Sequence, residues 1–341
     1  MRLRRPKSTK SPSSTGYLCL LLLLLFYPVP LAFAQDAVAQ PETKAPGSRI
    51  KPKSGKPLNQ PTRIIDYKSV ADKNHAVNPL RLHVFSPESN AEKKAPVIVF
   101  FFGGGWVGGT PKQFYPQAQY LAERGLVAIA AEYRVKNQHG TSPYECVEDG
   151  RSAIRWIRKN AESLHVDPDR VIAAGGSAGG HVAACTAVIE DAATEQDDTR
   201  VSSVPNAMIL FNPVLDTTSK GYGSGRFTDQ QQTELSPCHH VRPGLPPTLL
   251  FHGTADKTVP FENAERFDKL MREAGNQCRL VPFEGQGHGF FNAPTFRPGP
   301  QAEEFSDRTM QESVRFLIQL GYPVEPTTED GNNRKSTKEP S

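Results

Sequence analysis

Cysteine is scarce in this chain, at five of 341 residues, and one of the five, Cys19, lies in an apolar segment near the N-terminus. The remaining four allow three disulfide pairings, and nothing in the sequence selects among them: Cys146, Cys185, Cys238 and Cys278. A domain of this length buries about three quarters of the surface that its unfolded chain exposes, so it does not need cross-links to fold. We therefore expect buried or free thiols rather than a disulfide framework.

An excess of one charge is also missing. The net charge is +4, and five basic residues before the first apolar run more than account for it: Arg2, Arg4, Arg5, Lys7 and Lys10. The rest of the chain is nearly neutral and contains no basic stripe with interleaved aromatic residues. Nucleic-acid binding therefore has no electrostatic basis in this sequence, and a polyanion or a membrane surface is equally unsupported as a partner.

The N-terminal 34 residues have the three parts of a secretory signal peptide: a basic segment, an apolar run over 18–26 and Ala32-Phe33-Ala34 before a cleavage site. Cleavage there leaves Gln35 as the first residue. An uncleaved membrane anchor is the alternative, but the run is shorter than the ~20 apolar residues that a membrane span needs. The sequence thus predicts a signal peptide over 1–34 and a secreted or periplasmic protein, without stable membrane insertion after cleavage.

Both flanks of the mature chain have the composition of disordered segments. Residues 35–60 carry prolines among lysines and small polar residues, which is typical of a linker. Residues 323–341 are similarly polar and lack hydrophobic periodicity. We therefore expect one folded domain over 61–322 between a disordered linker and a disordered tail.

Strand and helix patterns alternate within this central region. Two alternating apolar segments, 63–67 and 80–85, predict an antiparallel pair. Apolar runs typical of strands buried on both faces follow at 97–102, 126–131, 171–175, 207–211, 248–251 and 279–283. Helical patterns lie at 113–123, 142–161, from 178 onwards, 262–274 and 303–320. The alternation predicts an α/β fold with a mostly parallel central sheet and helices on both faces.

The alternation is interrupted over residues 216–246, which are rich in Gly, Ser, Thr, Gln and Pro. Such a stretch is either a cap over a site or a long surface loop, and the sequence leaves both open. It contains the adjacent His239 and His240, but no carboxylates or cysteines at a spacing that would complete a metal site. We therefore expect no metal there.

The segment Gly175-Gly176-Ser177-Ala178-Gly179 matches the pattern G-x-S-x-G between a predicted strand and a predicted helix. A strand that turns at once into a helix crowds the residues on both sides of the serine, and the outer glycines remove that crowding. The serine would hold a strained backbone conformation that costs about 1–3 kcal/mol. A phosphate-binding turn is the alternative, but the P-loop lysine is missing. Ser177 is therefore the candidate nucleophile.

A serine hydroxyl needs a base to take its proton. His288 lies in a glycine-rich segment after the last predicted strand, and Asp256 lies on a loop after the preceding strand. The order Ser, Asp, His along the chain is the one expected for this serine motif, with the acid fixing the tautomer of the imidazole. In the alternative interpretation Asp256 only caps the next helix, and Glu262 is the acid.

Together these motifs resemble those of the α/β-hydrolase fold, and in particular bacterial esterases related to the acetyl esterase, feruloyl esterase-like and hormone-sensitive lipase groups. The resemblance covers about residues 63–322. It rests on Phe102-Gly103-Gly104-Gly105-Trp106, Ala131-Glu132-Tyr133-Arg134, Gly176-Ser177-Ala178-Gly179-Gly180-His181, His252-Gly253 through Asp256 to Pro260, and Gly287-His288-Gly289-Phe290. Gly176 and His181 favour the acetyl or feruloyl esterase branch over the hormone-sensitive lipase pattern.

The resemblance implies an oxyanion hole formed by the backbone N–H groups of Gly104, Gly105 and Ala178. Phe102 stands where histidine is usual in these families. This change removes a hydrogen bond that fixes the loop, but the donors remain because they belong to the backbone. As a further hypothesis, three aromatic residues next to the catalytic loops line the acyl or alcohol pocket: Trp106, Phe290 and Phe291.

The sequence therefore predicts a serine carboxylesterase that acts through an acyl-enzyme on small esters of acetyl or feruloyl type, polysaccharide-linked esters among them, without a metal or organic cofactor. Two alternatives stay open. A serine hydrolase of amides, either a peptidase or an arylformamidase, would use the same three residues, and a noncatalytic binding protein would retain only the fold. The natural ester and the oligomeric state are not determined by the sequence.

Overall fold

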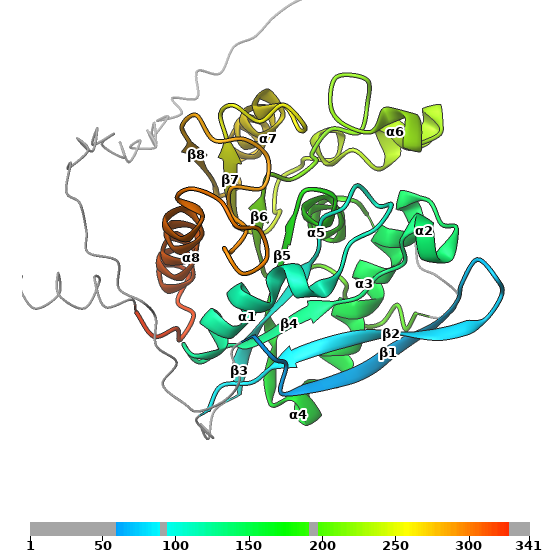
Figure 1. The fold of residues 1–341 in the computed structure, drawn as a ribbon, viewed down its shortest axis with the longest axis vertical. Helices are drawn as coiled ribbons and strands as arrows, with labels where there is room; N and C mark the ends of the chain where they lie inside the picture. The colour runs from blue at the N-terminus through cyan, green and yellow to red at the C-terminus, as the bar shows by residue number, and fades with distance from the viewer. Residues whose placement is uncertain (1–58, 89–93, 191–196, 327–341) are drawn as a thin grey trace, which may run out of the picture. The chain divides into compact units, whose positions relative to one another are not determined.

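The computed structural model describes residues 59–88, 94–190 and 197–326 (Figure 1). The predicted signal peptide over 1–34 and most of the predicted linker and tail lie outside the described residues. The strands are β1 (Arg63–Ala71), β2 (Val77–Phe85), β3 (Ala95–Phe101), β4 (Val127–Ala131), β5 (Val166–Gly176), β6 (Ala207–Phe211), β7 (Thr248–Gly253) and β8 (Cys278–Phe283). The α-helices are α1 (Tyr115–Ala122), α2 (Lys136–His139), α3 (Pro143–Lys159), α4 (Ala161–Leu164), α5 (Ala178–Val188), α6 (Asp229–Glu234), α7 (Phe261–Glu273) and α8 (Ala302–Gln319).

The strands of the described residues form one sheet in the order β1-β2-β4-β3-β5-β6-β7-β8. β2 pairs antiparallel with β1 and β4, and the other pairings are parallel. Figure 1 shows β1 and β2 at one end of the twisted sheet and β7 and β8 at the other. The predicted antiparallel pair and the predicted mostly parallel sheet are both confirmed.

Alternating side chains of the buried strands point into two separate cores. In β3, Val97, Val99 and Phe101 belong to the core that includes side chains of α3, α5 and α7. Ile98 and Phe100 of the same strand belong to the core that includes side chains of α1 and α8. Because successive side chains of a strand point to opposite faces, helices cover the sheet on both sides, as predicted.

Helix boundaries differ from the predicted ones where capping groups intervene. The pattern over 142–161 predicted one helix, but α3 ends at Lys159 and a separate turn, α4, follows Asn160. At its other end α3 is closed by a capping box, in which the Ser142 hydroxyl accepts from the backbone of the first turn and Glu145 accepts from the Ser142 N–H. The predicted helix over 113–123 begins instead with a 3-10 turn, η1 (Pro111–Phe114), before α1.

A buried carboxylate joins three parts of the fold. The Asp149 side chain of α3 is fully buried and pairs with Lys68 Nζ of β1 at 2.8 Å. It also pairs with Arg134 Nε, from the segment after β4, at 2.8 Å. Loss of one partner of such a buried pair leaves an uncompensated charge and costs about 3–5 kcal/mol. These ion pairs therefore connect β1, at the edge of the sheet, and the segment after β4 to helix α3.

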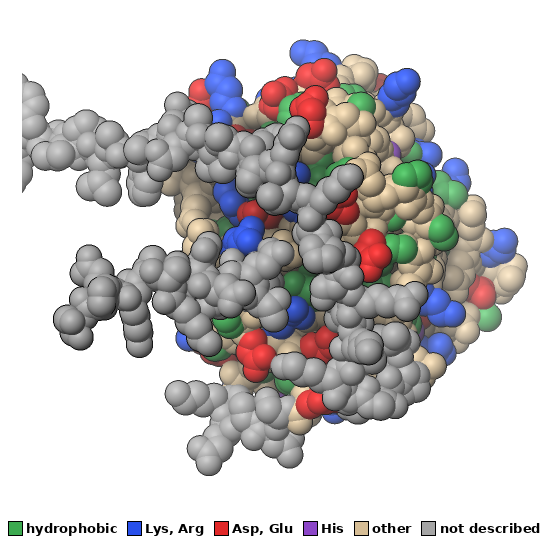
Figure 2. Space-filling model, turned by 60° about the vertical axis from the view of Figure 1, so that its left-hand side comes forward, with side chains coloured by type: hydrophobic (Ala, Val, Ile, Leu, Met, Phe, Trp, Pro, Cys, Tyr) green, Lys and Arg blue, Asp and Glu red, His purple; other side chains and the backbone are tan. Residues whose placement is uncertain are grey.

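The four cysteines of the described residues are free thiols, as expected: Cys146, Cys185 and Cys238 are buried and Cys278 is half-buried. Figure 2 shows acidic and basic side chains interspersed on the visible face rather than gathered in one patch. No helix in the described part of the chain is both long and apolar enough to cross a membrane.

Candidate active site

The residues singled out by the sequence motifs meet at one edge of the sheet. Ser177 follows β5, Asp256 follows β7, and His288 follows β8. Because these strands are parallel, their carboxyl ends lie at the same edge, which is where ligands bind in sheets of this kind. The fold thus brings together three side chains that are separated by 79 and 32 positions in the sequence.

Ser177 has a strained backbone conformation, with φ 54° and ψ −119°. Hydrogen bonds hold it there: its N–H donates to the Phe211 carbonyl, and its carbonyl accepts from the N–H groups of His181 and Val214. A Cβ on Gly175 would lie 2.4 Å from the Gly179 carbonyl oxygen, and one on Gly179 would lie 2.1 Å from the Phe101 carbonyl oxygen. The glycines around the serine are therefore required by close backbone contact.

Ser177, His288 and Asp256 form one hydrogen-bonded line. The Ser177 hydroxyl lies 2.9 Å from His288 Nε2, and His288 Nδ1 lies 2.7 Å from Asp256 Oδ2. The Asp256 side chain is fully buried, whereas the His288 side chain retains 21% exposure. An imidazole whose Nδ1–H donates to a carboxylate presents an unprotonated Nε2 to the hydroxyl, which is the arrangement needed for general-base catalysis.

Asp256 is ionised despite its burial. Burial opposes the charged form, but hydrogen bonds from His252 and His288 and the nearby imidazole hold the pKa of Asp256 well below its ordinary value. The N–H groups of Thr258 and Val259 also donate to its Oδ1 atom, at 2.8 and 3.0 Å. The aspartate therefore supplies the negative charge that orients the imidazole, in addition to closing the turn before α7.

Two residues to which the sequence analysis gave no role in the site also contact Asp256. The Asn212 side chain donates to Asp256 Oδ2 at 2.8 Å, and His252 Nε2 lies 3.4 Å from the same oxygen. Asn212 has φ 42° and directly follows β6. A polar residue immediately after a fully apolar strand, at the edge where the serine strand also ends, was the signal that could have identified Asn212.

Two of the candidate oxyanion donors, Gly104 and Gly105, line the same cavity as Ser177, and the third, Ala178, directly follows the serine. Within the described residues, the N–H groups of Gly104, Gly105 and Ala178 have no hydrogen-bond acceptor. Ala178 is the first residue of α5, so its N–H has no partner within the helix. Phe102, which replaces the usual histidine, stacks on Tyr133 with ring centroids 4.2 Å apart. The Tyr133 hydroxyl donates to the Phe102 carbonyl at 2.6 Å.

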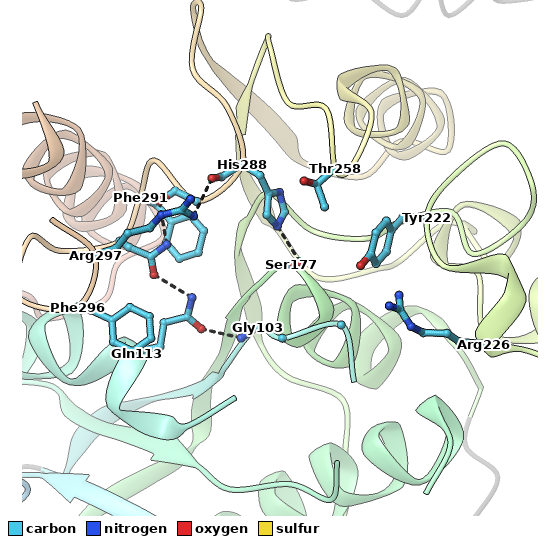
Figure 3. Close-up of a pocket in the computed structure, with 14 residues that line it drawn as sticks. Gly103, Gln113, Ser177, Tyr222, Arg226, Thr258, His288, Phe291, Phe296 and Arg297 are labelled. Atoms are coloured by element: carbon cyan, nitrogen blue, oxygen red, sulfur yellow. Dashed lines mark hydrogen bonds between the residues drawn. The ribbon is translucent and has the colours of Figure 1, made fainter. Parts of the chain in front are cut away.

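A chain of amide groups connects the glycine loop to the His288 loop. Gln113 Oε1 accepts from the Gly103 N–H at 2.6 Å, and Gln113 Nε2 donates to Asn292 Oδ1 at 2.8 Å. Asn292 Nδ2 in turn donates to the Gly289 carbonyl at 2.8 Å. Figure 3 shows Gln113 between these two loops. The loop that lost its usual histidine contact is therefore held by other side chains.

A cavity of about 300 Å³ opens in front of Ser177. Its walls come from the glycine loop, the segment after His288, Thr258 and the stretch 216–246, and Figure 3 shows how they surround the serine. Tyr222 and Arg226 are the contribution of the 216–246 stretch. This stretch thus forms one wall of the site. Of the two possibilities that the sequence left open, a cap and a long surface loop, the structure favours the cap.

Of the three aromatic residues expected in the pocket, only Phe291 lines this cavity. The expectation is corrected for Trp106, which lies behind the wall, whereas Phe290 lines a second pocket on the other side of His288 rather than this cavity. Trp106 is 1% exposed and packs against His181, with its Nε1–H donating to His181 Nδ1 at 3.2 Å. Phe290 stacks on Phe283 with centroids 4.2 Å apart. Proximity to a catalytic loop in sequence did not reveal on which side of the loop each ring lies.

The other sequence candidates lie apart from the three-residue line. Glu262, the alternative acid, is an exposed residue in the first turn of α7. His239 bonds to the Ser236 hydroxyl and His240 to the Thr233 carbonyl. In the described ranges no three His, Cys, Asp or Glu side chains are grouped as metal ligands would be.

Comparison with known proteins agrees with the geometry. The family model described as "BD-FAE" matches residues 82–220, and that of the dienelactone hydrolase family matches residues 209–319. The esterase LipC of Mycobacterium tuberculosis is 30% identical over 244 residues, which are 65% of this chain and 59% of LipC. The chain spans about half of the length of the curated relatives it matches.

Solved structures cover more of the chain. Esterase 2 of Thermogutta terrifontis, phosphoramylated by tabun, is 44% identical, with a TM-score of 0.70 over 78% of this chain and 96% of the esterase. A structure of the same esterase with propionate bound is 42% identical, with the same TM-score over 80% of this chain and 98% of the esterase. The likeness therefore extends over most of this chain and nearly all of the esterase.

Proposed function

The chain belongs to the α/β-hydrolase serine esterases, and on this basis we propose that it hydrolyses small carboxylic esters through an acyl-enzyme formed on Ser177. The observation that carries the proposal is the line from Ser177 through His288 to the buried Asp256, at 2.9 and 2.7 Å. This line ends at a cavity with free backbone N–H groups beside the serine.

In the first half of the reaction, the Ser177 oxygen attacks the ester carbonyl while His288 Nε2 takes the hydroxyl proton. Negative charge develops on the carbonyl oxygen, and the N–H groups of Gly104, Gly105 and Ala178 stabilise it. The tetrahedral intermediate then expels the alcohol, which receives its proton from His288. An acyl group remains on Ser177.

In the second half, water replaces the alcohol. His288 takes a proton from the water as it attacks the acyl carbonyl, and returns that proton to the Ser177 oxygen when the carboxylic acid leaves. Asp256 stays ionised throughout and stabilises the imidazolium that forms in each half. Serine and histidine are thus regenerated without a metal or organic cofactor.

The acyl group is proposed to be small, of acetyl or feruloyl type, with polysaccharide-linked esters among the substrates. The cavity volume of about 300 Å³ supports a short acyl group, as does the propionate-bound form of the similar esterase. The polysaccharide part of the proposal rests on the predicted secretion and the resemblance of the motifs. The protein is proposed to act outside the cytoplasm, in the secreted or periplasmic space.

The first experiment measures hydrolysis of p-nitrophenyl acetate by the purified protein and by Ser177→Ala. Loss of the nucleophile should reduce kcat by about 10⁴-fold or more. Ser163→Ala, at an exposed serine of α4, is the matched control and should retain the parent rate. No turnover by the parent, with Ser177→Ala indistinguishable from it, would instead support a binding protein, and equal turnover by an active parent and Ser177→Ala would contradict Ser177 as the nucleophile. Faster cleavage of p-nitroacetanilide than of the ester would support an amide hydrolase.

A further inference from the structure

Two arginines border the cavity in front of Ser177, and no acidic residue lines it. Arg226 comes from the cap, in the 3-10 turn η2 (Ser224–Arg226), and Arg297 comes from the segment after His288. The lining residues include no Asp or Glu. Figure 3 shows the two arginines on opposite sides of Ser177. The entrance to the proposed active site therefore carries positive charge that its own walls do not neutralise.

Each arginine lies against a loop that takes part in the chemistry. A Cβ on Gly105, one of the oxyanion donors, would lie 3.6 Å from the guanidinium carbon of Arg226. Arg297 Nη1 donates to the His288 carbonyl at 3.1 Å. A charged group bound by either arginine would therefore lie close to the ester bond.

Arg226 is the better placed of the two to bind an anion. Its guanidinium lies 5.2 Å from the ring of Tyr222 and 6.0 Å from that of Trp106, which holds the side chain beside the cavity. Within the described residues the Arg226 guanidinium forms no ion pair and no hydrogen bond. Arg297, in contrast, already donates a hydrogen bond from Nη1 to the His288 carbonyl. Other exposed arginines are neutralised locally, such as Arg200 by Asp198 and Arg279 by Glu312.

We propose that the natural substrate is an ester whose alcohol part carries a carboxylate, which pairs with Arg226 while Arg297 adds to the attraction. This inference rests on the proposed esterase function and specifies its substrate class. A guanidinium binds a carboxylate through two parallel hydrogen bonds, which adds orientation to attraction. The carboxylate belongs to the alcohol part because both arginines are exposed at the rim, whereas the interior, next to the buried Phe291, suits a short acyl group.

The test compares two acetyl esters of nearly equal shape, 4-acetoxybenzoate and 4-acetoxybenzamide, which differ in the charge of the alcohol part. The quantity of interest is the ratio of kcat/KM for the benzoate to that for the benzamide. In Arg226→Gln this ratio should fall about tenfold, as expected for loss of a charge-assisted hydrogen bond. Arg226→Lys should lower it less because the charge remains, and Arg297→Gln should also lower it less.

Arg200→Gln is the matched control, because it removes one exposed positive charge that does not line the cavity. Its ratio should equal that of the parent. Added salt should lower the ratio in the parent, through screening of the Arg226 charge, and should change it much less in Arg226→Gln.

An unchanged ratio in Arg226→Gln overturns the inference. So does failure to cleave 4-acetoxybenzoate by a protein that cleaves p-nitrophenyl acetate, whether or not the benzamide is cleaved. Failure to cleave p-nitrophenyl acetate at all would instead count against the esterase function itself, so the two failures are distinguishable.

Discussion

At the scale of single residues, the surroundings of Asp256 keep its buried carboxylate charged. Its Oδ2 atom faces His288, Asn212 and His252 at 2.7, 2.8 and 3.4 Å. Burial raises the pKa of Asp256, but hydrogen bonds from His252, His288 and the Val259 N–H lower it by more, and the Asn212 amide is a further donor to the same carboxylate. Asn212 is thereby a positioning residue, since it acts on the imidazole through the aspartate.

Asn212→Gly should lower kcat by about tenfold to a hundredfold and change KM much less. The reason is that glycine tolerates the positive φ at this position but lacks the amide that donates to Asp256. A hydrogen bond to a charged group contributes about 1.5–3 kcal/mol. The measurement is kcat and KM for p-nitrophenyl acetate, well below the melting temperature.

The control for this variant is Asn276→Ala. Asn276 is also buried, and it bonds the Leu245 N–H and the Arg242 carbonyl rather than the catalytic line. Its loss should lower the melting temperature while leaving kcat near the parent value. Equal effects of the two substitutions on kcat would show that Asn212 acts only through stability.

At the scale of elements, the site is assembled from loops that the ends of parallel strands place side by side. The glycine loop follows β3, the serine turn follows β5 and the histidine loop follows β8. The amide chain through Gln113 and Asn292 joins the first of these loops to the last. The positions of the oxyanion donors and of the base are therefore coupled by side chains rather than by the sheet alone.

Gln113→Ala should lower kcat by about ten- to a hundredfold, because small displacements of catalytic groups have effects of this size. Gln113→Glu is the informative companion, since a carboxylate still accepts from the Gly103 N–H but cannot donate to Asn292 Oδ1. We expect an intermediate kcat for this variant. Steady-state kinetics with p-nitrophenyl acetate measures both, and parent-like kcat in the alanine variant would show that the amide chain is dispensable.

At the scale of the whole molecule, a buried histidine connects the cap to the serine helix. His181 of α5 is fully buried, accepts from Trp106 Nε1–H and bonds the Leu235 carbonyl of the cap at 2.7 Å. Burial lowers the pKa of His181 from 6.5 to about 4, although the hydrogen bond to Leu235 opposes this shift. The neutral ring is therefore part of the packing that attaches residues 216–246 to the domain.

Protonation of His181 should make the folded state less stable in acid. Between pH 6.5 and about pH 4 the unfolded chain binds a proton at this position and the folded chain does not. The stability that the neutral His181 ring contributes is therefore fully present above pH 6.5. As the pH falls toward 4, the free energy of unfolding decreases by on the order of 3 kcal/mol. Urea unfolding at a series of pH values measures it.

The comparison variants for this experiment are His181→Gln and Trp106→Phe. Glutamine cannot titrate, so the free energy of unfolding of His181→Gln should decrease less on acidification than that of the parent. Trp106→Phe removes the donor to His181 but keeps the titrating ring, so it should be less stable at every pH with the pH dependence retained. A parent-like pH dependence in His181→Gln would contradict the assignment.

The sequence by itself determined the fold class, the strand order along the chain and the three candidate catalytic residues. This was possible because burial on both faces produces unbroken apolar strands, and because the turn at Ser177 requires glycines at 175 and 179. The start of α3 at the N-cap Ser142 was predicted, but its end was not, because the helix stops before Asn160 and the separate turn α4 follows.

Only the tertiary structure decided which side chains face the cavity. Trp106, Phe290 and Phe291 are equally close to catalytic loops in sequence, but only the last lines the cavity. The contribution of Asn212 to Asp256 and the place of Arg226 beside the serine also became visible only there. The physical reason is that a side chain's direction depends on contacts between segments far apart in the chain, which local patterns of burial and turn formation do not contain.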